Sequence, residues 1–146
     1  FSNNVLVDGA CDAACPAGFE CRAGVATGCA PGKYAPEVRL VPDHMRDCIP
    51  CDPGTFANET NSTSCHPCPA GKTSKMGEHA CFDCPAGEYA PRAASPCLSC
   101  PAGTYSLAGA GTCTNCTAGR FASEVGTNVA CYACDGATTE AATECA

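Results

Sequence analysis

Residues 97–106 read Cys-Leu-Ser-Cys-Pro-Ala-Gly-Thr-Tyr-Ser, and variants of this stretch recur along the chain. The variants are marked by Cys-x-x-Cys pairs at Cys48/Cys51, Cys65/Cys68, Cys81/Cys84, Cys97/Cys100, Cys113/Cys116 and Cys131/Cys134. The second cysteines of successive pairs are 17, 16, 16, 16 and 18 residues apart. A period this short and regular predicts stacked copies of one small unit.

A turn and an aromatic residue follow most of the pairs. Glycine recurs three residues after the second cysteine, often as Cys-Pro-Ala-Gly, which predicts a type I turn with proline at its second position. The Pro-Gly step of Cys51-Asp-Pro-Gly suits a type II turn instead. Two residues after the glycine comes an aromatic residue, which we expect to pack on the disulfide, with a sugar-binding role as the alternative. These residues are Tyr34, Phe56, Tyr89, Tyr105 and Phe121, whereas threonine stands at 73 and 139.

The chain holds too few large apolar side chains to build an ordinary core. Its 146 residues include 4 Leu, 1 Ile, 7 Val, 5 Phe and no Trp. At about 25 cal/mol per Å² of buried apolar surface, these cannot offset an ordering entropy of about 1–2 kcal/mol per residue. The 17 cysteines therefore predict that disulfides replace the core. They also predict an extracellular or cell-surface location, because many structural disulfides persist only in an oxidising compartment.

The simplest disulfide scheme joins the second cysteine of one pair to the first cysteine of the next. It predicts the bonds Cys29–Cys48, Cys51–Cys65, Cys68–Cys81, Cys84–Cys97, Cys100–Cys113, Cys116–Cys131 and Cys134–Cys145. Sequence alone does not fix connectivity, so this ladder rests on its economy. Three cysteines, Cys11, Cys15 and Cys21, keep no assigned partner. One of the three must bond outside the segment or stay free. If the chain is an excerpt of a longer protein, this cysteine is separated from its partner. If the chain is complete, this cysteine would link two subunits covalently.

Sequons and charge agree with an extracellular segment. N-glycosylation is expected at three Asn-x-Ser/Thr sequons, Asn58, Asn61 and Asn115. The net charge is −7 and the 8 basic residues are scattered singly, so we expect no nucleic-acid partner. No apolar stretch approaches the roughly 20 residues of a membrane-spanning helix. The chain starts at Phe1 and ends one residue after Cys145, so we expect both ends to be cuts from a longer protein.

The motif Cys-x-x-Cys-Pro-Ala-Gly-Thr-Tyr-Ser resembles the ephrin-receptor-like cysteine-rich repeats, which are related in style to EGF-like and tumour-necrosis-factor-receptor modules. Residues 97–106 carry it almost unaltered, and Cys15-Pro-Ala-Gly-Phe-Glu-Cys21 resembles the variant that opens such arrays. In receptors, arrays of this kind are spacers or ligand platforms. The Ala-rich and Gly-rich loops look more like protist or algal surface antigens, surface coats and flagellar hairs (mastigonemes).

Other chemistry has less support in the sequence. The spacing of Cys65, Cys68, Cys81 and Cys84 is compatible with a zinc ribbon, but the pairs form a continuous series and do not group into fours. Cys65-His-Pro-Cys68 superficially resembles a redox dithiol. Such a dithiol lies at the start of a helix, but no amphipathic helix follows it in this sequence. We therefore expect His66 to be an exposed loop residue. The chain has only three histidines, at 44, 66 and 79. We expect no enzyme activity, no cofactor and no metal site.

The least repetitive segment is the insertion at 37–47, which follows Cys29 and contains Leu40 and Val41. It is either a longer loop on an atypical terminal repeat or a contact surface for a neighbouring subunit or chain segment. Proline at position 42 argues against a continuous helix.

The sequence therefore predicts a small disulfide-rich fold, an elongated tandem repeat of short turn and β-hairpin units with little or no helix. We expect an atypical cysteine-rich segment at 1–28, a unit with the inserted loop at 29–50, and tandem repeats of about 16 residues at 51–146. The expected function is structural, in a glycoprotein that forms a surface coat, filament or flagellar hair. Its partners would be other copies of itself, other segments of a longer chain, and N-glycans. The alternative is a ligand-binding or spacer ectodomain of a receptor or adhesion protein.

Overall fold

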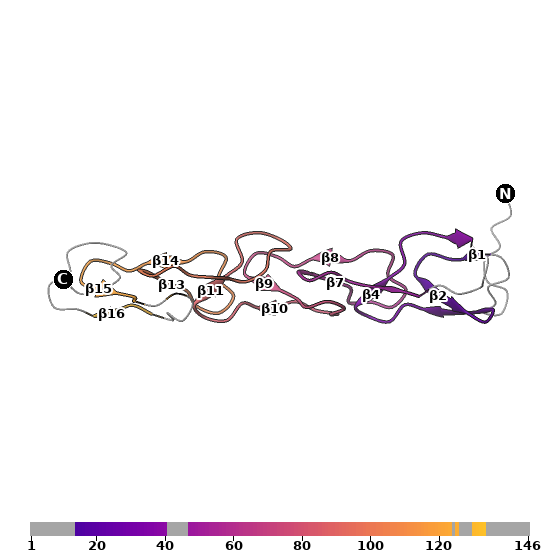
Figure 1. Ribbon diagram of the computed structural model, residues 1–146, viewed down its shortest axis with the longest axis horizontal. Coiled ribbons are helices and arrows are strands. Elements are labelled where there is room, and N and C mark those ends of the chain that lie inside the picture. Colours follow the sequence, from indigo (N-terminus) through magenta and orange to yellow (C-terminus); the bar gives the residue numbers. More distant parts are fainter. Residues whose placement is uncertain (1–13, 41–46, 124, 126–129, 134–146) are drawn as a thin grey trace. The chain divides into compact units, whose positions relative to one another are not determined.

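The computed structural model describes residues 14–40, 47–123, 125 and 130–133. In these residues the regular structure consists of short β-strands in two-stranded sheets, without a helix (Figure 1). This confirms the predicted class, a small disulfide-rich tandem repeat of short hairpins. By its internal contacts the chain divides into two compact units, Phe1–His66 with Lys75–Ala80, and Pro67–Ser74 with Cys81–Ala146.

The strands of the first unit pair in four sheets, β1 with β5, β2 with β3, β4 with β6, and β7 with β8. The first three sheets are antiparallel. The strands are β1 (Ala14–Cys15), β2 (Phe19–Arg22), β3 (Val25–Gly28), β4 (Lys33–Tyr34), β5 (Arg39–Leu40), β6 (Ile49–Pro50), β7 (Thr55–Phe56) and β8 (His66–Pro67), which ends one residue beyond the unit.

The second unit has four antiparallel sheets, each made of two consecutive strands of two residues. The strands are β9 (Lys72–Thr73), β10 (Phe82–Asp83), β11 (Glu88–Tyr89), β12 (Leu98–Ser99), β13 (Thr104–Tyr105), β14 (Thr114–Asn115), β15 (Arg120–Phe121) and β16 (Tyr132–Ala133). In each of these sheets, the aromatic or threonine position of a repeat pairs with the residue directly after the first cysteine of the next Cys-x-x-Cys pair. Tyr89, for example, pairs with Leu98, which follows Cys97.

The repeated turn starts one residue later than the sequence predicts. In the repeat that begins at Cys84, the Glu88 amide donates to the Pro85 carbonyl at 3.0 Å, so Gly87 is the third residue of the turn. Gly87 has φ +87°, and a positive φ at the third position is the mark of a type II turn. The expected type I turn is therefore wrong, whereas the type II geometry expected at Asp52-Pro-Gly-Thr55 is present. The glycine decides the turn type, because it adopts a positive φ without steric cost.

The core of each repeat consists of a disulfide and one small residue. The residue after the aromatic position is buried in six repeats, with at most 3% of its surface exposed. These residues are Ala35, Ala57, Ser74, Ala90, Ser106 and Ala122. Where serine replaces alanine at 106, its hydroxyl donates to the Glu88 carbonyl at 2.8 Å, so the buried polar group has a partner.

Consecutive repeats are joined by backbone hydrogen bonds. A loop residue in the left-handed conformation donates its amide to the carbonyl of the cysteine that opens the preceding repeat. In the first unit the donors are Asn61, to Cys29 at 2.9 Å, and Gly77, to Cys51 at 2.8 Å. In the second unit they are Ala94, to Cys68 at 2.9 Å, and Gly109, to Cys84 at 2.8 Å.

A second backbone contact repeats beside the first. The amide of the turn glycine donates to the carbonyl of the small buried residue in the next repeat, as from Gly32 to Ala57 at 2.7 Å and from Gly103 to Ala122 at 2.7 Å. The same bond joins Gly18 to Ala35, Gly71 to Ala90, and Gly87 to Ser106. Amides and carbonyls that a two-residue strand cannot pair are thus satisfied by the neighbouring repeat.

The turn glycines also lie against the backbone of a more distant loop. A Cβ atom at Gly32 would overlap the carbonyl oxygen of Gly77, and one at Gly71 would overlap that of Gly109. Gly18 is covered in the same way by the carbonyl of Asn61. These positions therefore exclude a side chain on two grounds, the positive φ and the close backbone.

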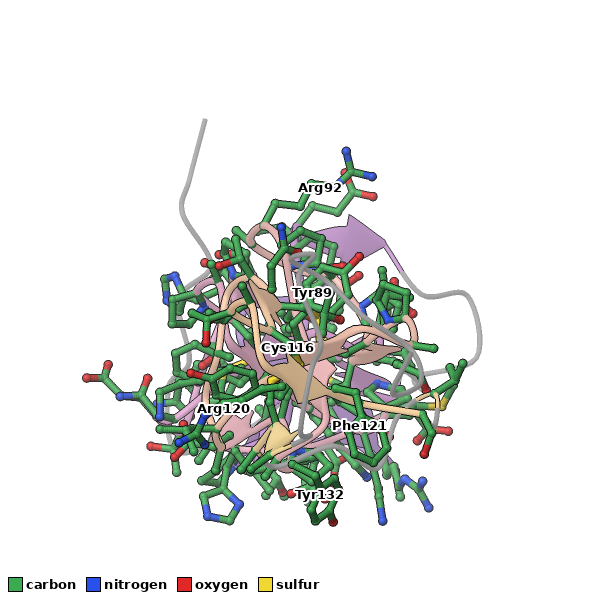
Figure 2. The ribbon with its side chains drawn as sticks, turned by 90° about the vertical axis from the view of Figure 1, so that its left-hand side faces the viewer. Tyr89, Arg92, Cys116, Arg120, Phe121 and Tyr132 are labelled. Carbon is green, nitrogen blue, oxygen red and sulfur yellow. A yellow bond between two sulfur atoms is a disulfide. The ribbon has the colours of Figure 1, made fainter. Side chains whose placement is uncertain are left out.

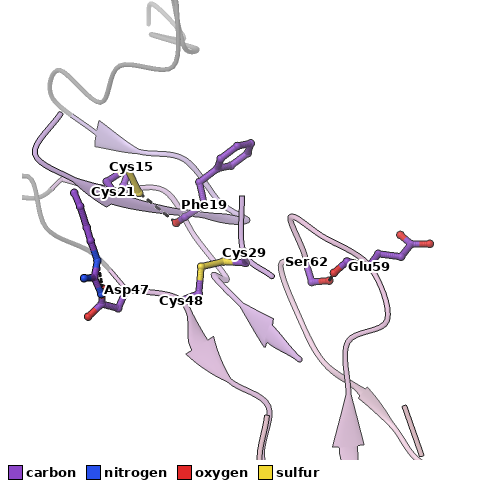
Figure 3. Close-up of a disulfide and its surroundings, with 9 residues drawn as sticks. Cys15, Phe19, Cys21, Cys29, Asp47, Cys48, Glu59 and Ser62 are labelled. Carbon is purple, nitrogen blue, oxygen red and sulfur yellow. Dashed lines mark hydrogen bonds and ion pairs between the residues drawn. A yellow bond between two sulfur atoms is a disulfide. The ribbon is translucent and has the colours of Figure 1, made fainter. Parts of the chain in front are cut away.

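The inserted segment is not only a longer loop, because its strand β5 pairs with β1, Arg39 opposite Cys15 and Leu40 opposite Ala14. At the end of the insertion, Asp47 accepts a hydrogen bond from Nε of Arg22 at 3.0 Å (Figure 3). The insertion thus contacts another segment of the same chain. Val41 and His44 lie outside the described residues.

Substituting Gly32 with alanine should destabilise the first unit by more than substituting Gly24. Both glycines have a positive φ, but a Cβ at Gly24 meets no atom within 4 Å. Gly24→Ala should cost about 1–2 kcal/mol from the backbone alone. Gly32→Ala should add about 1–3 kcal/mol of steric overlap. Hydrogen exchange of the two oxidised variants, followed by peptide mass spectrometry, measures both effects. Equal loss of protection in the two variants would contradict the close backbone contact.

Candidate functional site

Seven disulfides join the described cysteines. They are Cys15–Cys21, Cys29–Cys48, Cys51–Cys65, Cys68–Cys81, Cys84–Cys97, Cys100–Cys113 and Cys116–Cys131. Six of these are bonds of the ladder scheme, and the seventh joins two of the cysteines that the sequence left unassigned (Figure 3). Cys11, Cys134 and Cys145 lie outside the described residues.

The disulfides bear directly on the metal and redox alternatives. Each cysteine of the zinc-ribbon spacing is bonded, Cys65 to Cys51, Cys68 to Cys81 and Cys84 to Cys97. A sulfur in a disulfide is no thiolate, and zinc is bound by thiolates. Cys65 and Cys68 also bond to different partners, so they do not form the disulfide of a redox motif. Among the described residues, no three His, Cys, Asp or Glu side chains gather where a metal ion could bind.

The aromatic residues divide between covering a disulfide and facing a cross-strand neighbour. Tyr105 packs against the cluster of Cys116, Ala122 and Cys131, so it covers the disulfide of the next repeat. Phe121 faces Tyr132 across the hairpin, with ring centroids 5.8 Å apart, and Figure 2 shows the two rings on the same side of the ribbon. In the same way, Phe56 lies 5.9 Å from His66. His66 is exposed as expected, but it lies on strand β8 and not in a loop.

The hairpins leave apolar side chains exposed at one repeated position, directly after the first cysteine of a pair. Ile49 is 44% exposed, Phe82 43%, Leu98 41% and Tyr132 60%. Each lies opposite the aromatic or threonine position of its own hairpin, as Leu98 opposite Tyr89. We call these four residues the hairpin apolar positions.

The three sequon asparagines are exposed and lie in different settings. Asn58 lies in the loop after β7, and Asn115 lies on β14 opposite Thr104. Asn61 has φ +59° and is the left-handed donor to Cys29. Its Oδ1 lies so close to Gly28 that a Cβ there would overlap it. Asparagine is one of the few residues apart from glycine that adopt this conformation readily, so the repeat junction itself explains Asn61.

His79 and the described charged residues are dispersed. His79 and Asp52 are exposed, and Asp47 pairs with Arg22. A second ion pair joins Lys72 and Asp83 across the β9–β10 hairpin at 2.6 Å. Both pairs are exposed, where an ion pair contributes about 0–1 kcal/mol. His44 lies outside the described residues.

A family model described as tyrosine-protein kinase ephrin type A/B receptor-like matches residues 39–76 and 87–129, more than half of the chain. The chain belongs to this ephrin-receptor-like family. Its cysteine-rich repeat is a non-catalytic module, and no catalytic domain is detected. Repeats with this many disulfides are typical of extracellular segments.

Comparison with curated proteins finds no match to this ephrin-receptor-like chain. Within the described residues, no helix has the length and apolar character needed to cross a membrane.

Asn61 offers a test of the junction that is independent of glycosylation. In protein made in a host without N-glycosylation, Asn61→Gln should destabilise the first unit by about 1–2 kcal/mol, because glutamine adopts the left-handed conformation poorly. Asn61→Gly should keep the junction. Asn58→Gln is the matched control, since substitutions of exposed residues usually change stability by less than about 0.5 kcal/mol. Thermal unfolding of the oxidised variants gives the comparison. An Asn61→Gln variant as stable as the parent would contradict the assigned role.

Proposed function

We propose that the chain is a structural segment of an extracellular glycoprotein whose repeats build a surface coat, filament or flagellar hair. The observation that carries this proposal is the repeat junction. The donors Asn61, Gly77, Ala94 and Gly109 use the same backbone bond to a cysteine carbonyl in both units. Apart from the turn glycine and the left-handed donor, a junction made of backbone groups places few demands on side chains, so repeats can be added by copying while the rest of each loop varies.

The disulfides support the same proposal, because each one closes within a short stretch of chain. The separations run from 6 residues, between Cys15 and Cys21, to 19 residues, between Cys29 and Cys48. A closed loop of about 15 residues contributes roughly 3 kcal/mol in the chain-entropy model. Each repeat therefore brings its own covalent stabilisation, and a long array needs no large apolar core.

We assign the hairpin apolar positions of each unit to contact between copies. Ile49, Phe82, Leu98 and Tyr132 each expose more than 40% of their surface, although the chain is poor in large apolar residues. Exposed apolar side chains gain free energy when a partner covers them, at about 25 cal/mol per Å². By the resemblance of the Ala-rich and Gly-rich loops to those of protist and algal coat proteins and mastigonemes, we expect that partner to be other copies of the chain.

A second candidate is a ligand-binding or spacer ectodomain of a receptor or adhesion protein. It is favoured by the family description, which refers to ephrin receptors. In that case the hairpin apolar positions would contact a different protein. The two candidates differ in what the purified segment does alone, because only the first requires it to associate with itself.

Leu98→Ser should weaken self-association of the oxidised segment at least severalfold, because it removes an apolar contact from the β12 hairpin. Leu107→Ser is the matched control. Leu107 is more exposed, at 66% against 41% for Leu98, but it lies in a loop and not on a hairpin. Sedimentation velocity over a concentration series measures association, and electron microscopy shows whether filaments form. A strictly monomeric parent segment would overturn the structural proposal in favour of the ectodomain. If Leu98→Ser and Leu107→Ser weakened self-association equally, the hairpin apolar positions would not be the contact between copies.

A further inference from the structure

The first sequon directly follows an aromatic pair. Phe56 is half-buried on β7, and its ring centroid lies 5.9 Å from that of the exposed His66. Two residues after Phe56 comes Asn58, which is exposed and is the acceptor residue of the sequon. Ala57, the residue between them, is fully buried. The chain therefore turns Ala57 into the repeat and leaves Asn58 at its surface.

The backbone at Ala57 is extended. The Ala57 amide donates to the Glu78 carbonyl at 3.4 Å, and the Ala57 carbonyl accepts from the Gly32 amide at 2.7 Å. Glu78 and Gly32 are neighbours, because a Cβ atom at Gly32 would lie 3.3 Å from the carbonyl carbon of Glu78. Both backbone groups of Ala57 thus point to the same side, as they do in a β-strand. In an extended segment alternate side chains share a face, so Phe56 and Asn58 leave the same face of the chain.

The loop that begins at Asn58 is held at its other end. Ser62 donates from Oγ to the Glu59 carbonyl at 2.8 Å (Figure 3). The carbonyl of Ser62 accepts from the amide of Ala35 at 3.0 Å. These bonds fix the loop against the rest of the first unit, so the position of Asn58 beside Phe56 is built into the fold.

Other repeats place an apolar residue at the position of Asn58. Where the aromatic position carries tyrosine, the residue two places later is exposed and apolar, namely Pro36, Pro91 or Leu107. An unmodified asparagine supplies no such group beside Phe56. A sugar on Asn58 would supply it, because a pyranose ring has an apolar face of C–H groups that matches an aromatic ring. The hydroxyls at the edge of the sugar could bond with the ring nitrogens of His66.

The other two sequons lie in different settings. Asn61 is the left-handed donor of a repeat junction, and its Oδ1 lies against Gly28. Asn115 lies on β14, where the strand register places its side chain on the face of the hairpin opposite to that of Tyr105. Asn58 thus differs from both in sharing a face with the aromatic residue of its own repeat.

We propose that Asn58 carries an N-glycan and that its first sugar lies on the Phe56 ring, beside His66. The proposal rests on the extracellular glycoprotein function above. In the attachment step, Nδ2 of Asn58 bonds to the anomeric carbon of a lipid-diphosphate-linked oligosaccharide. The carbon–oxygen bond to the diphosphate breaks, the lipid diphosphate leaves with the electron pair, and Nδ2 loses one proton. The bound sugar then covers an aromatic ring that the repeat itself leaves half-exposed.

The test is NMR spectroscopy of the chain secreted from a eukaryotic host in ¹³C-glucose medium, with each glycan trimmed enzymatically to a single N-acetylglucosamine. The sugar signals that disappear in Asn58→Gln belong to Asn58. We expect nuclear Overhauser contacts between this sugar and the Phe56 ring, and upfield shifts of the sugar protons from the ring current. Phe56→Leu should return these shifts to the values of the reduced, unfolded protein.

Phe121→Leu is the matched control. Phe121 faces Tyr132 at 5.8 Å, much as Phe56 faces His66, but a serine stands two residues after it. This variant removes an equivalent ring and should leave the shifts of the Asn58 sugar unchanged. Equal loss of the shifts in the two variants would contradict the contact with Phe56.

The failures are distinguishable. A sugar on Asn58 with unfolded-state shifts in the native parent protein would overturn the proposal, since the contact with Phe56 would be absent. Glycopeptide mass spectrometry of the same sample gives the occupancy of each sequon. An unmodified Asn58 beside a glycosylated Asn115 would overturn the proposal too, while leaving the extracellular glycoprotein function intact. If no sequon carried sugar, the glycoprotein part of the proposed function would fall with it.

Discussion

The described structure depends on one backbone hydrogen bond, from a left-handed loop residue to the carbonyl of the cysteine that opens the preceding repeat. Asn61, Gly77, Ala94 and Gly109 each make this bond. The bond fixes the loop against the turn glycine of another repeat, as Gly77 against Gly32. A side chain at this turn glycine would overlap the backbone of the loop. Because two-residue strands leave most amides and carbonyls unpaired, the junction is where these groups find partners. The disulfides hold each hairpin closed, and the junction bonds connect the hairpins within each unit.

This division of roles explains the unusual composition. Fully buried positions are occupied by cysteine, alanine and serine, as at Cys84, Ala90 and Ser106, so little room remains inside for a large side chain. The larger apolar residues are left at the hairpin surface, where Leu98 and Phe82 lie exposed. In a protein with a conventional core these side chains would supply stability. Here they are available for contact with other molecules.

The cysteine spacing was enough to predict the hairpins and the six ladder bonds described. Each of these disulfides closes a short loop, so its two cysteines recur at a regular spacing in the local sequence. The junction was harder to predict. Its donors are Asn61, Gly77, Ala94 and Gly109, which share a backbone conformation but no residue type. The buried Ala90 and Ser106 were also missed, although a small residue directly after the aromatic position was a visible signal. The frame of the turn was predicted wrongly from Cys-Pro-Ala-Gly, because proline was assigned to the second position. The turn instead starts at the proline and places the glycine third, where its positive φ is needed. The pairing of Arg39 with Cys15 joins segments 24 residues apart and has no local signature.

Glycosylation at Asn115 would impose an order on folding. The sequon Asn115-Cys116-Thr117 encloses a cysteine that is fully buried and bonded to Cys131 in the folded chain. Its asparagine lies on β14, paired with β13, so the folded sequon is held in an extended strand. A transferase that must enclose the acceptor needs this segment free, and hence must act before Cys116 and Cys131 are joined. The sugar would then be present when the last described repeat closes. Asn58, in the loop between β7 and β8, is under no such constraint.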